Sequence, residues 1–119
     1  MTILKTNIEN LAEDPRMIYF MTTTSGINAS KADTTDHYTV DAWLQYEEEN
    51  SKGELQKVLA VMTRNAAGER VKLQTISETF TREFFKIAEI MGNDKYAIIV
   101  RNGKTKGGRD YVTCELYFE

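Results

Sequence analysis

The chain has 119 residues, of which 41% are hydrophobic and 28% charged, and its formal net charge at pH 7 is −3. This length allows one domain with a real hydrophobic core, spanning residues 1–119, but not two. The negative net charge excludes a global attraction to nucleic acid or to an anionic membrane, so any such binding must come from a local patch of cations.

The single cysteine, Cys114, has no partner for an internal disulfide bond, which fits a reducing compartment. The first residues, MTILKTNIENLAED, carry no signal-peptide pattern. No apolar run approaches the roughly 18 residues that a membrane span needs. We therefore expect a soluble, cytoplasmic protein without a membrane partner.

The N-terminal third predicts a mixture of short elements. Residues 3–12 place apolar side chains at helical spacing, and Pro15 is expected to end any helix there. Residues 1–15 are therefore predicted to form a short helix or an arm. Residues 17–24, MIYFMTTT, are rich in aromatic and β-branched side chains, which predicts a strand. Residues 25–36 consist of turn formers and are expected to be a polar loop.

Alternating patterns from residue 37 onward predict five more strands. They cover residues 37–46, 55–65, 70–77, 95–101 and 109–118. The first of them has a clean period of two: one face carries Tyr38, Val40, Ala42, Leu44 and Tyr46, and the other carries His37, Thr39, Asp41, Trp43 and Gln45. In residues 55–65 the pattern leaves open which face is inside, and a bulge is one solution.

One amphipathic helix is predicted over residues 79–91. Phe80, Phe84, Ile87 and Met91 fall on one face. Ser77 or Thr79 can provide the N-cap, and Gly92 is placed to end the helix.

The fold class that this order favours is mainly β with one helix. From residue 37 the order is strand, strand, strand, helix, strand, strand, which is the order of an OB-fold, a small five-stranded Greek-key barrel with a helix between strands 3 and 4. The strand at 17–24 would be an N-terminal addition to the barrel. Other small α+β folds can use the same string of elements.

The stretch RNGKTKGGRD, residues 101–110, resembles a phosphate-binding loop at first sight. A Walker loop containing Lys104 and Thr105 needs a glycine at position 98, where this chain has Ile98, and a helix after the loop. A strand pattern follows instead. No spacing of His37, Cys114 and carboxylates indicates a metal site, and no constellation indicates catalysis. We expect no enzyme activity, no cofactor and no metal.

Binding signals are stronger than catalytic ones. Residues 101–109 hold four cations and no acid in a chain of net negative charge, and three glycines allow close backbone approach to a ligand. The cations are Arg101, Lys104, Lys106 and Arg109. A flexible, soluble hairpin tip explains the same pattern without any ligand.

Trp43 and several other side chains complete the predicted site. Trp43 lies on the polar face of its strand, where stacking on an unpaired base would explain it; packing or a subunit interface would explain it too. Tyr111 and Tyr117 share the face opposite the apolar side chains of the last strand, and Tyr111 is a second stacking candidate. Strands 2 and 3 of an OB barrel contribute to its ligand face. On this basis Arg64, Arg70 and Lys72 are predicted to assist phosphate binding.

The chain resembles the small OB-fold single-stranded DNA-binding proteins encoded by tailed phages, particularly those of lactic-acid bacteria. The resemblance covers roughly residues 17–118 and rests on chain length, element order, the basic hairpin at 101–109 and the endings YAIIVR and YVTCELYF. It implies non-catalytic, sequence-independent binding of single-stranded DNA in phage replication and recombination, in the host cytoplasm. It also implies a homo-oligomer, either a dimer or a tetramer, with recombination or replication proteins as further candidate partners.

A protein-interaction module is the alternative interpretation. The chain would then be a phage-encoded inhibitor of a host factor, or an accessory subunit of a replication or virion complex. Trp43 would be the centre of the contact, and the acidic run Glu47, Glu48 and Glu49 would contribute charge.

Overall fold

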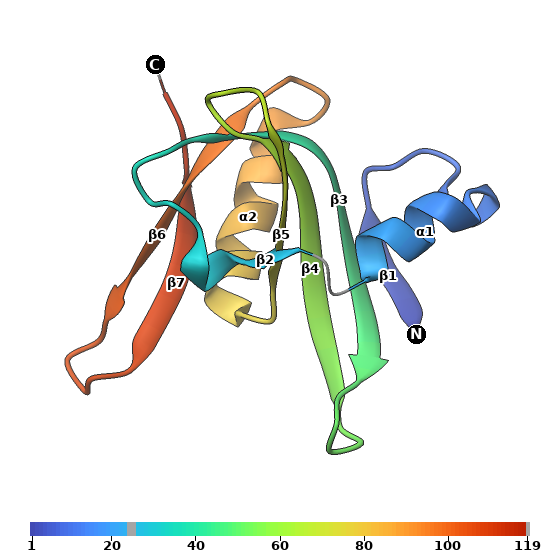
Figure 1. Ribbon diagram of the computed structural model, residues 1–119, viewed down its shortest axis with the longest axis horizontal. Helices are drawn as coiled ribbons and strands as arrows, with labels where there is room; N and C mark the ends of the chain where they lie inside the picture. The colour runs from blue at the N-terminus through green and yellow to red at the C-terminus, as the bar shows by residue number, and fades with distance from the viewer. Residues whose placement is uncertain (24–25, 119) are drawn as a thin grey trace.

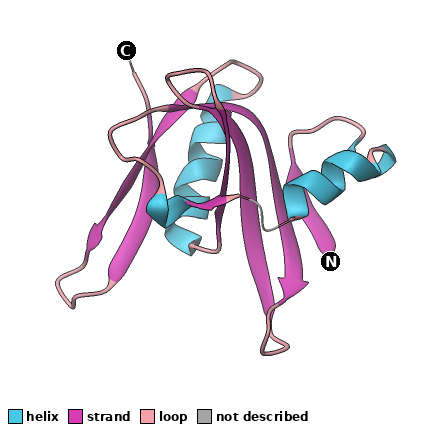
Figure 2. Cartoon of the chain, in the orientation of Figure 1, coloured by secondary structure: helices cyan, strands magenta, loops and turns pink. Residues whose placement is uncertain are grey.

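The protein is a curled, open β-sheet with two α-helices, seen in a computed structural model that describes residues 1–23 and 26–118 (Figures 1 and 2). Within these residues the strands are β1 (Thr2–Thr6), β2 (Ile27–Asn28), β3 (Tyr38–Glu49), β4 (Leu55–Arg64), β5 (Arg70–Thr75), β6 (Ala97–Lys104) and β7 (Asp110–Leu116). The α-helices are α1 (Pro15–Thr22) and α2 (Glu78–Met91), and the short 3-10 helices are η1 (Leu11–Glu13) and η2 (Ala29–Lys31).

The sheet runs in the order β2-β5-β4-β3-β6-β7, with β1 paired to β3 beside this path. The pairings are antiparallel except for β2 with β5. β3 is long enough to pair β6 near its start and β1 near its end. Within the described residues β5 and β7 are not paired, so the sheet forms a half-barrel rather than a closed barrel, and η2 contacts both sides of the opening.

The elements predicted from residue 37 onward are present. The five strands correspond to β3 through β7, and the predicted helix corresponds to α2. The Ser77 side chain accepts a hydrogen bond from the Phe80 N–H at 3.2 Å and caps α2. Gly92 ends the helix with φ +58°, a backbone conformation that residues with a Cβ rarely adopt.

The N-terminal third differs from the prediction. Within residues 1–15, where a short helix or an arm was predicted, the chain forms β1 and η1. The prediction of a strand at residues 17–24 is wrong, because residues 17–22 lie in α1; residue 24 lies outside the described residues. Asp14 accepts a hydrogen bond from the Met17 N–H at 3.1 Å, and Pro15 occupies the start of α1. Proline needs no hydrogen-bonded N–H at that position, so Pro15 begins a helix here instead of ending one. The described sheet therefore has seven strands in place of the predicted six, which were five barrel strands and one N-terminal addition, and α2 lies between the fifth and the sixth.

Two hydrophobic cores lie on opposite faces of the sheet. The core inside the curl joins α2 to β3 through β7 and includes Leu59, Val61, Phe80, Phe84, Ile98 and Val100. The second core lies under α1 and η1 on the outer face of β3 and β4 and includes Leu11, Met21, Leu44, Tyr46, Val58 and Ala60. Because β4 is buried on both faces, its sequence shows no alternation, and a bulge in β4 is not needed to explain it.

A β-bulge divides the apolar residues of β3 between these two cores. The register of β3 against β4 shifts between Val40 and Ala42. An extra residue at this point exchanges the inward and outward faces of the strand. Val40 therefore packs in the core inside the curl, whereas Leu44 and Tyr46 pack under α1. The prediction of one continuous apolar face from residue 38 to residue 46 is wrong.

Candidate nucleic-acid interface

The hairpin formed by β6 and β7 projects from the body of the molecule as an arm, at the lower left of Figure 1. Its strands pair from Ile98 with Leu116 to Lys104 with Asp110. The tip closes with a hydrogen bond from the Thr105 N–H to the Arg109 carbonyl at 2.8 Å. We call residues 97–116 the β6–β7 arm.

The cations of the arm differ in how firmly they are held. The Lys104 ammonium lies 3.0 Å from the Asp110 carboxylate, and the Arg101 guanidinium lies 3.4 Å from Glu115. Both pairs are exposed, and such pairs contribute at most about 1 kcal/mol. A phosphate can therefore replace either carboxylate at small cost. Among the described residues, no acid lies within ion-pair distance of Lys106 or Arg109.

Tyr111 presents an aromatic ring on the outer side of the arm. Its side chain is 42% exposed and crosses to its neighbour Gly103 on β6. A Cβ at Gly103 would lie 2.9 Å from the Tyr111 hydroxyl oxygen, so the missing side chain makes room for the ring. The arm therefore carries a supported ring close to its cations, which is the combination that single-stranded nucleic acids bind.

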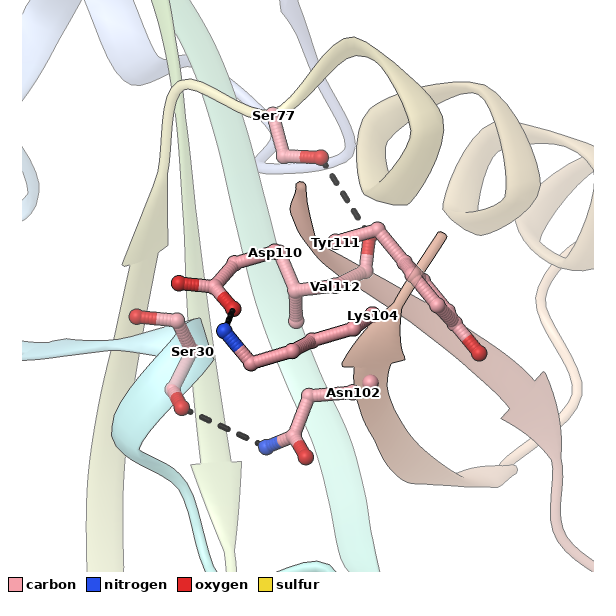
Figure 3. Close-up of a pocket in the computed structure, with 8 residues that line it drawn as sticks. Ser30, Ser77, Asn102, Lys104, Asp110, Tyr111 and Val112 are labelled. Atoms are coloured by element: carbon pink, nitrogen blue, oxygen red, sulfur yellow. Dashed lines mark hydrogen bonds and ion pairs between the residues drawn. The ribbon is translucent and has the colours of Figure 1, made fainter. Parts of the chain in front are cut away.

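An open pocket of about 660 Å³ lies between η2 and the half of the arm nearest its tip (Figure 3). The Asn102 side chain donates a hydrogen bond to the Ser30 carbonyl at 3.3 Å, which ties the arm to η2. Lys104 and Asp110 point toward Ser30, whereas Tyr111 turns to the other side of the ribbon. The amide, ammonium and carboxylate groups that line this pocket can hydrogen-bond to the edge of a base or to a sugar.

The nine predicted site residues do not form one site. Arg101, Lys104, Lys106, Arg109 and Tyr111 lie together on the arm. The other four, Trp43, Arg64, Arg70 and Lys72, lie elsewhere.

Trp43 packs against α2, which favours the packing explanation of this residue over stacking on a base. Because of the bulge in β3, its ring faces α2, with ring centroids 6.0 Å from Phe84 and 5.2 Å from Phe85. Its backbone is also held, since its N–H donates to the Asn7 side-chain oxygen at 2.7 Å.

Lys72 supports the end of α1, a position that does not favour the predicted contact with a phosphate. It is only 7% exposed, and its ammonium donates hydrogen bonds to the carbonyl oxygens of Phe20 and Thr23 at the end of α1. A cation there complements the partial negative charge of a helix C-terminus. Burial lowers the pKa of Lys72 below its usual value.

Arg64 and Arg70 lie at the other end of the barrel, beside the β4–β5 turn seen at the top of Figure 1. The Arg64 guanidinium donates two hydrogen bonds of 2.9 Å to the Asp41 carboxylate, and this lowers the pKa of Asp41. Arg70 is exposed and lies opposite Arg64 in the register of β4 against β5. Arg64 is therefore engaged in an ion pair within the fold, and the two arginines lie apart from the arm.

Sequence reasoning did not place two features that adjoin the arm. Ser30 reaches the pocket because η2 packs against the arm, and no local pattern marks it. His37 stacks on Tyr117 with ring centroids 4.3 Å apart and an interplanar angle of 6°. The alternation of the last strand indicated that Tyr117 shares a face with Tyr111, but the pairing of residues 37 and 117 depends on the fold.

Comparison of the chain with protein-family models, with curated proteins and with solved structures finds no match. No group of three or more metal-ligating side chains occurs in the part of the chain that the structure describes. No helix among those residues is long and apolar enough to cross a membrane.

Proposed function

We propose that the protein binds single-stranded DNA without sequence preference and without catalysis, as its resemblance to phage single-stranded DNA-binding proteins implies. Its role would be to coat and protect DNA strands during phage replication and recombination in the host cytoplasm. A homo-oligomeric state, and contacts with recombination or replication proteins, belong to the same proposal.

One observation carries this proposal: the β6–β7 arm gathers exposed cations and an exposed ring in a protein of net charge −3. Lys106 and Arg109 stand at its tip and Lys104 close by, with Tyr111 on the next strand. Cations that contact phosphates attract a strand without reading its sequence, and an exposed ring stacks on any base.

The sheet order supports assigning the half-barrel to the OB class. The path β5-β4-β3-β6-β7 consists of five consecutive strands of the chain, with α2 between the third and the fourth of them. β1, β2 and α1 are then additions to the barrel. In OB-folds the loop between the last two strands contacts the ligand, and that loop is the tip of the arm.

The test is a titration of fluorescein-labelled oligo-dT followed by anisotropy at several salt concentrations. Each phosphate contact contributes about −0.7 to the slope of log affinity against log salt. We expect the double variant Lys106→Gln/Arg109→Gln to bind more weakly, with a slope shallower by about 1.4. The matched control Lys52→Gln/Arg16→Gln removes the same charge from exposed positions off the arm and should bind as the wild type does. A wild type that does not bind oligo-dT at low salt would overturn the proposal.

A protein-interaction module is the second candidate, favoured by two neighbouring rings on α1. Tyr19 is 73% and Phe20 42% exposed. Exposed aromatic side chains are enriched at the centres of protein interfaces. Under this alternative the affinity for the partner depends weakly on salt, and Tyr19→Ala weakens it while the arm variants do not.

A further inference from the structure

The outer face of β4 and β5 is covered in this protein. Val58 and Ala60 of β4 are 6% and 0% exposed beneath α1. Lys72 of β5 fastens the end of that helix through its hydrogen bonds to Phe20 and Thr23. A nucleic-acid strand cannot lie on this face, the usual ligand face of an OB barrel, unless α1 leaves it.

The outer face of the arm is open instead. Successive side chains of a strand point to opposite faces. In β7, Val112 and Cys114 face the core, so Tyr111, Thr113 and Glu115 face outward. All three outward side chains are exposed or half-exposed, and the same holds for the outward positions of β6. Those positions are Ile99, Arg101 and Gly103.

Aromatic rings stand at both ends of this open face. Tyr111 lies at the end near the tip, over Gly103. Tyr117 lies at the other end, stacked on His37, and the two rings border a second open pocket of about 360 Å³. Tyr117 follows Tyr111 by six positions of nearly extended chain, a span of about 20 Å. A span of this length accommodates a few nucleotides, comparable to the smallest sites of OB-folds, about 4 nucleotides.

A cation lies between the rings. Arg101 faces outward next to the cross-strand partner Thr113, and it lines the pocket beside His37 and Tyr117. Two acids adjoin it: Glu115, in its exposed ion pair with Arg101, and Asp36 in the same pocket.

The two acids leave the cation available. The Asp36 carboxylate accepts backbone hydrogen bonds from His37 at 2.7 Å and Ala66 at 3.1 Å, which offset its charge. The pair of Arg101 with Glu115 is weak because it is exposed. Along the outer face of the arm, the order from the tip is therefore an aromatic ring, a cation and a second aromatic ring.

The geometry points to a path for the strand, and we propose that single-stranded DNA runs along the outer face of the arm from its tip to the His37–Tyr117 pair. One base stacks on Tyr111, another on the exposed surface of the His37–Tyr117 pair, and Arg101 contacts a phosphate between them. This path rests on the proposed function and adds a location to it: the strand avoids the face of β4 and β5 that α1 covers.

The test compares Tyr111→Leu and Tyr117→Leu with the control Tyr19→Leu, using anisotropy of fluorescein-labelled oligo-dT. Tyr19 lies on α1, away from the proposed path, and is 73% exposed. Loss of one stacked base should lower the affinity by roughly 5- to 150-fold for each arm variant. The control should bind within about twofold of the wild type. Circular dichroism verifies that each variant is folded.

The outcomes separate the path from the function. If the wild type binds oligo-dT but the arm variants bind as well as the control, the path is wrong and the function stands. If the wild type does not bind, the function itself fails. Photo-crosslinking of the wild type to an oligonucleotide containing 5-bromouracil provides a second measurement that needs no variant. Crosslinks at Tyr111, His37 or Tyr117 support the path, and crosslinks confined to α1 or to the face of β4 and β5 overturn it.

Discussion

The indole ring of Trp43 on β3 packs against the phenyl ring of Phe85 on α2, with centroids 5.2 Å apart and ring planes inclined by 56°. The Lys5 ammonium on β1 lies 4.9 Å from the centroid of the same Phe85 ring. The contact therefore links β1, β3 and α2 on the inside of the curled sheet. Trp43 contributes to the packing of the helix and does not project from the surface.

Replacing Trp43 should destabilise the protein without weakening DNA binding. Truncation of a large aromatic core residue costs about 3–5 kcal/mol, and because Trp43 is half-buried we expect Trp43→Ala to lose about 2–3 kcal/mol of unfolding free energy. Urea unfolding followed by circular dichroism measures this loss. Trp43→Phe keeps a ring against Phe85 and should lose less. If a folded Trp43→Ala variant no longer binds oligo-dT, Trp43 belongs to the binding site after all.

The inward position of Trp43 on β3 has a local physical cause, which the sequence pattern does not reveal. The alternation of residues 37–46 predicts the strand correctly, because an extended backbone with a period of two is what those residues form. A bulge adds one residue and reverses the faces beyond it. Asp41 lies at that point, and nothing in its immediate sequence distinguishes a bulge from regular pairing.

Lys72 should matter for stability and not for DNA binding. Its ammonium donates to the carbonyl oxygens of Phe20 and Thr23, so Lys72→Met removes these hydrogen bonds from the end of α1. The two carbonyls keep other donors, the Thr23 hydroxyl and the Gln74 amide. Hydrogen bonds to a charged group contribute about 1.5–3 kcal/mol each, and because the remaining donors offset part of the loss we expect the unfolding free energy to fall by about 1–3 kcal/mol. Arg70→Met, at an exposed position of the same strand, is the control and should change stability by less than about 0.5 kcal/mol. Equal losses for the two variants would contradict the role of Lys72.

α1 also explains why the outer face of β4 and β5 is buried although the sequence of β5 predicts a solvated face. A cation at alternate positions of a strand normally indicates a solvated face, and Lys72 fits that pattern in the sequence. The face is buried because residues 15–22 form a helix that packs on it. The signals for that helix were present in Asp14 and Pro15, at the N-cap and the first helical position. The aromatic and β-branched side chains that follow favour a strand locally, and tertiary packing overrides that preference.

The ion pair between Asp41 and Arg64 should make the free energy of unfolding depend on pH in the acidic range. The hydrogen bonds from Arg64 lower the pKa of Asp41 in the folded state. Such a carboxylate stabilises the fold above its unfolded pKa, near 3.9, and this contribution is lost as the pH falls through the lower folded pKa. Asp41→Asn should therefore cost about 1 kcal/mol at pH 7. The difference from the wild type should shrink below about pH 4.

Urea unfolding at pH 7 and pH 3 measures this dependence. Asp110→Asn is the matched control, because Asp110 also pairs with a cation, Lys104, but its side chain is 85% exposed. Its effect should be near zero at both pH values. A constant penalty for Asp41→Asn across this range would show that the carboxylate acts through something other than its charge.

The candidate site was predictable where it is local in sequence. Residues 101–109 carry their cations and glycines within one hairpin, so the arm follows from the chain itself. The pocket between the arm and η2 was not predictable, because Ser30 and Asn102 meet only through the packing of η2 at the opening of the barrel. The stacking of His37 on Tyr117 likewise joins the start of β3 to the end of the chain across the fold.

Cys114 should be chemically inert while the protein is folded. The thiol lies in the core inside the curl, 3% exposed, and its sulfur donates toward the Phe80 carbonyl oxygen. Burial raises the pKa of Cys114 to about 12, with the nearby carboxylates of Glu83 and Glu115 adding to the shift. Because the thiolate is the reactive form, reaction with an aromatic disulfide reagent at pH 8 should be at least about 100-fold slower in the native protein than in guanidinium chloride. Rapid native reaction would instead mean that β7 separates from α2 readily, and the arm would then lack the rigid base on which the proposed path depends.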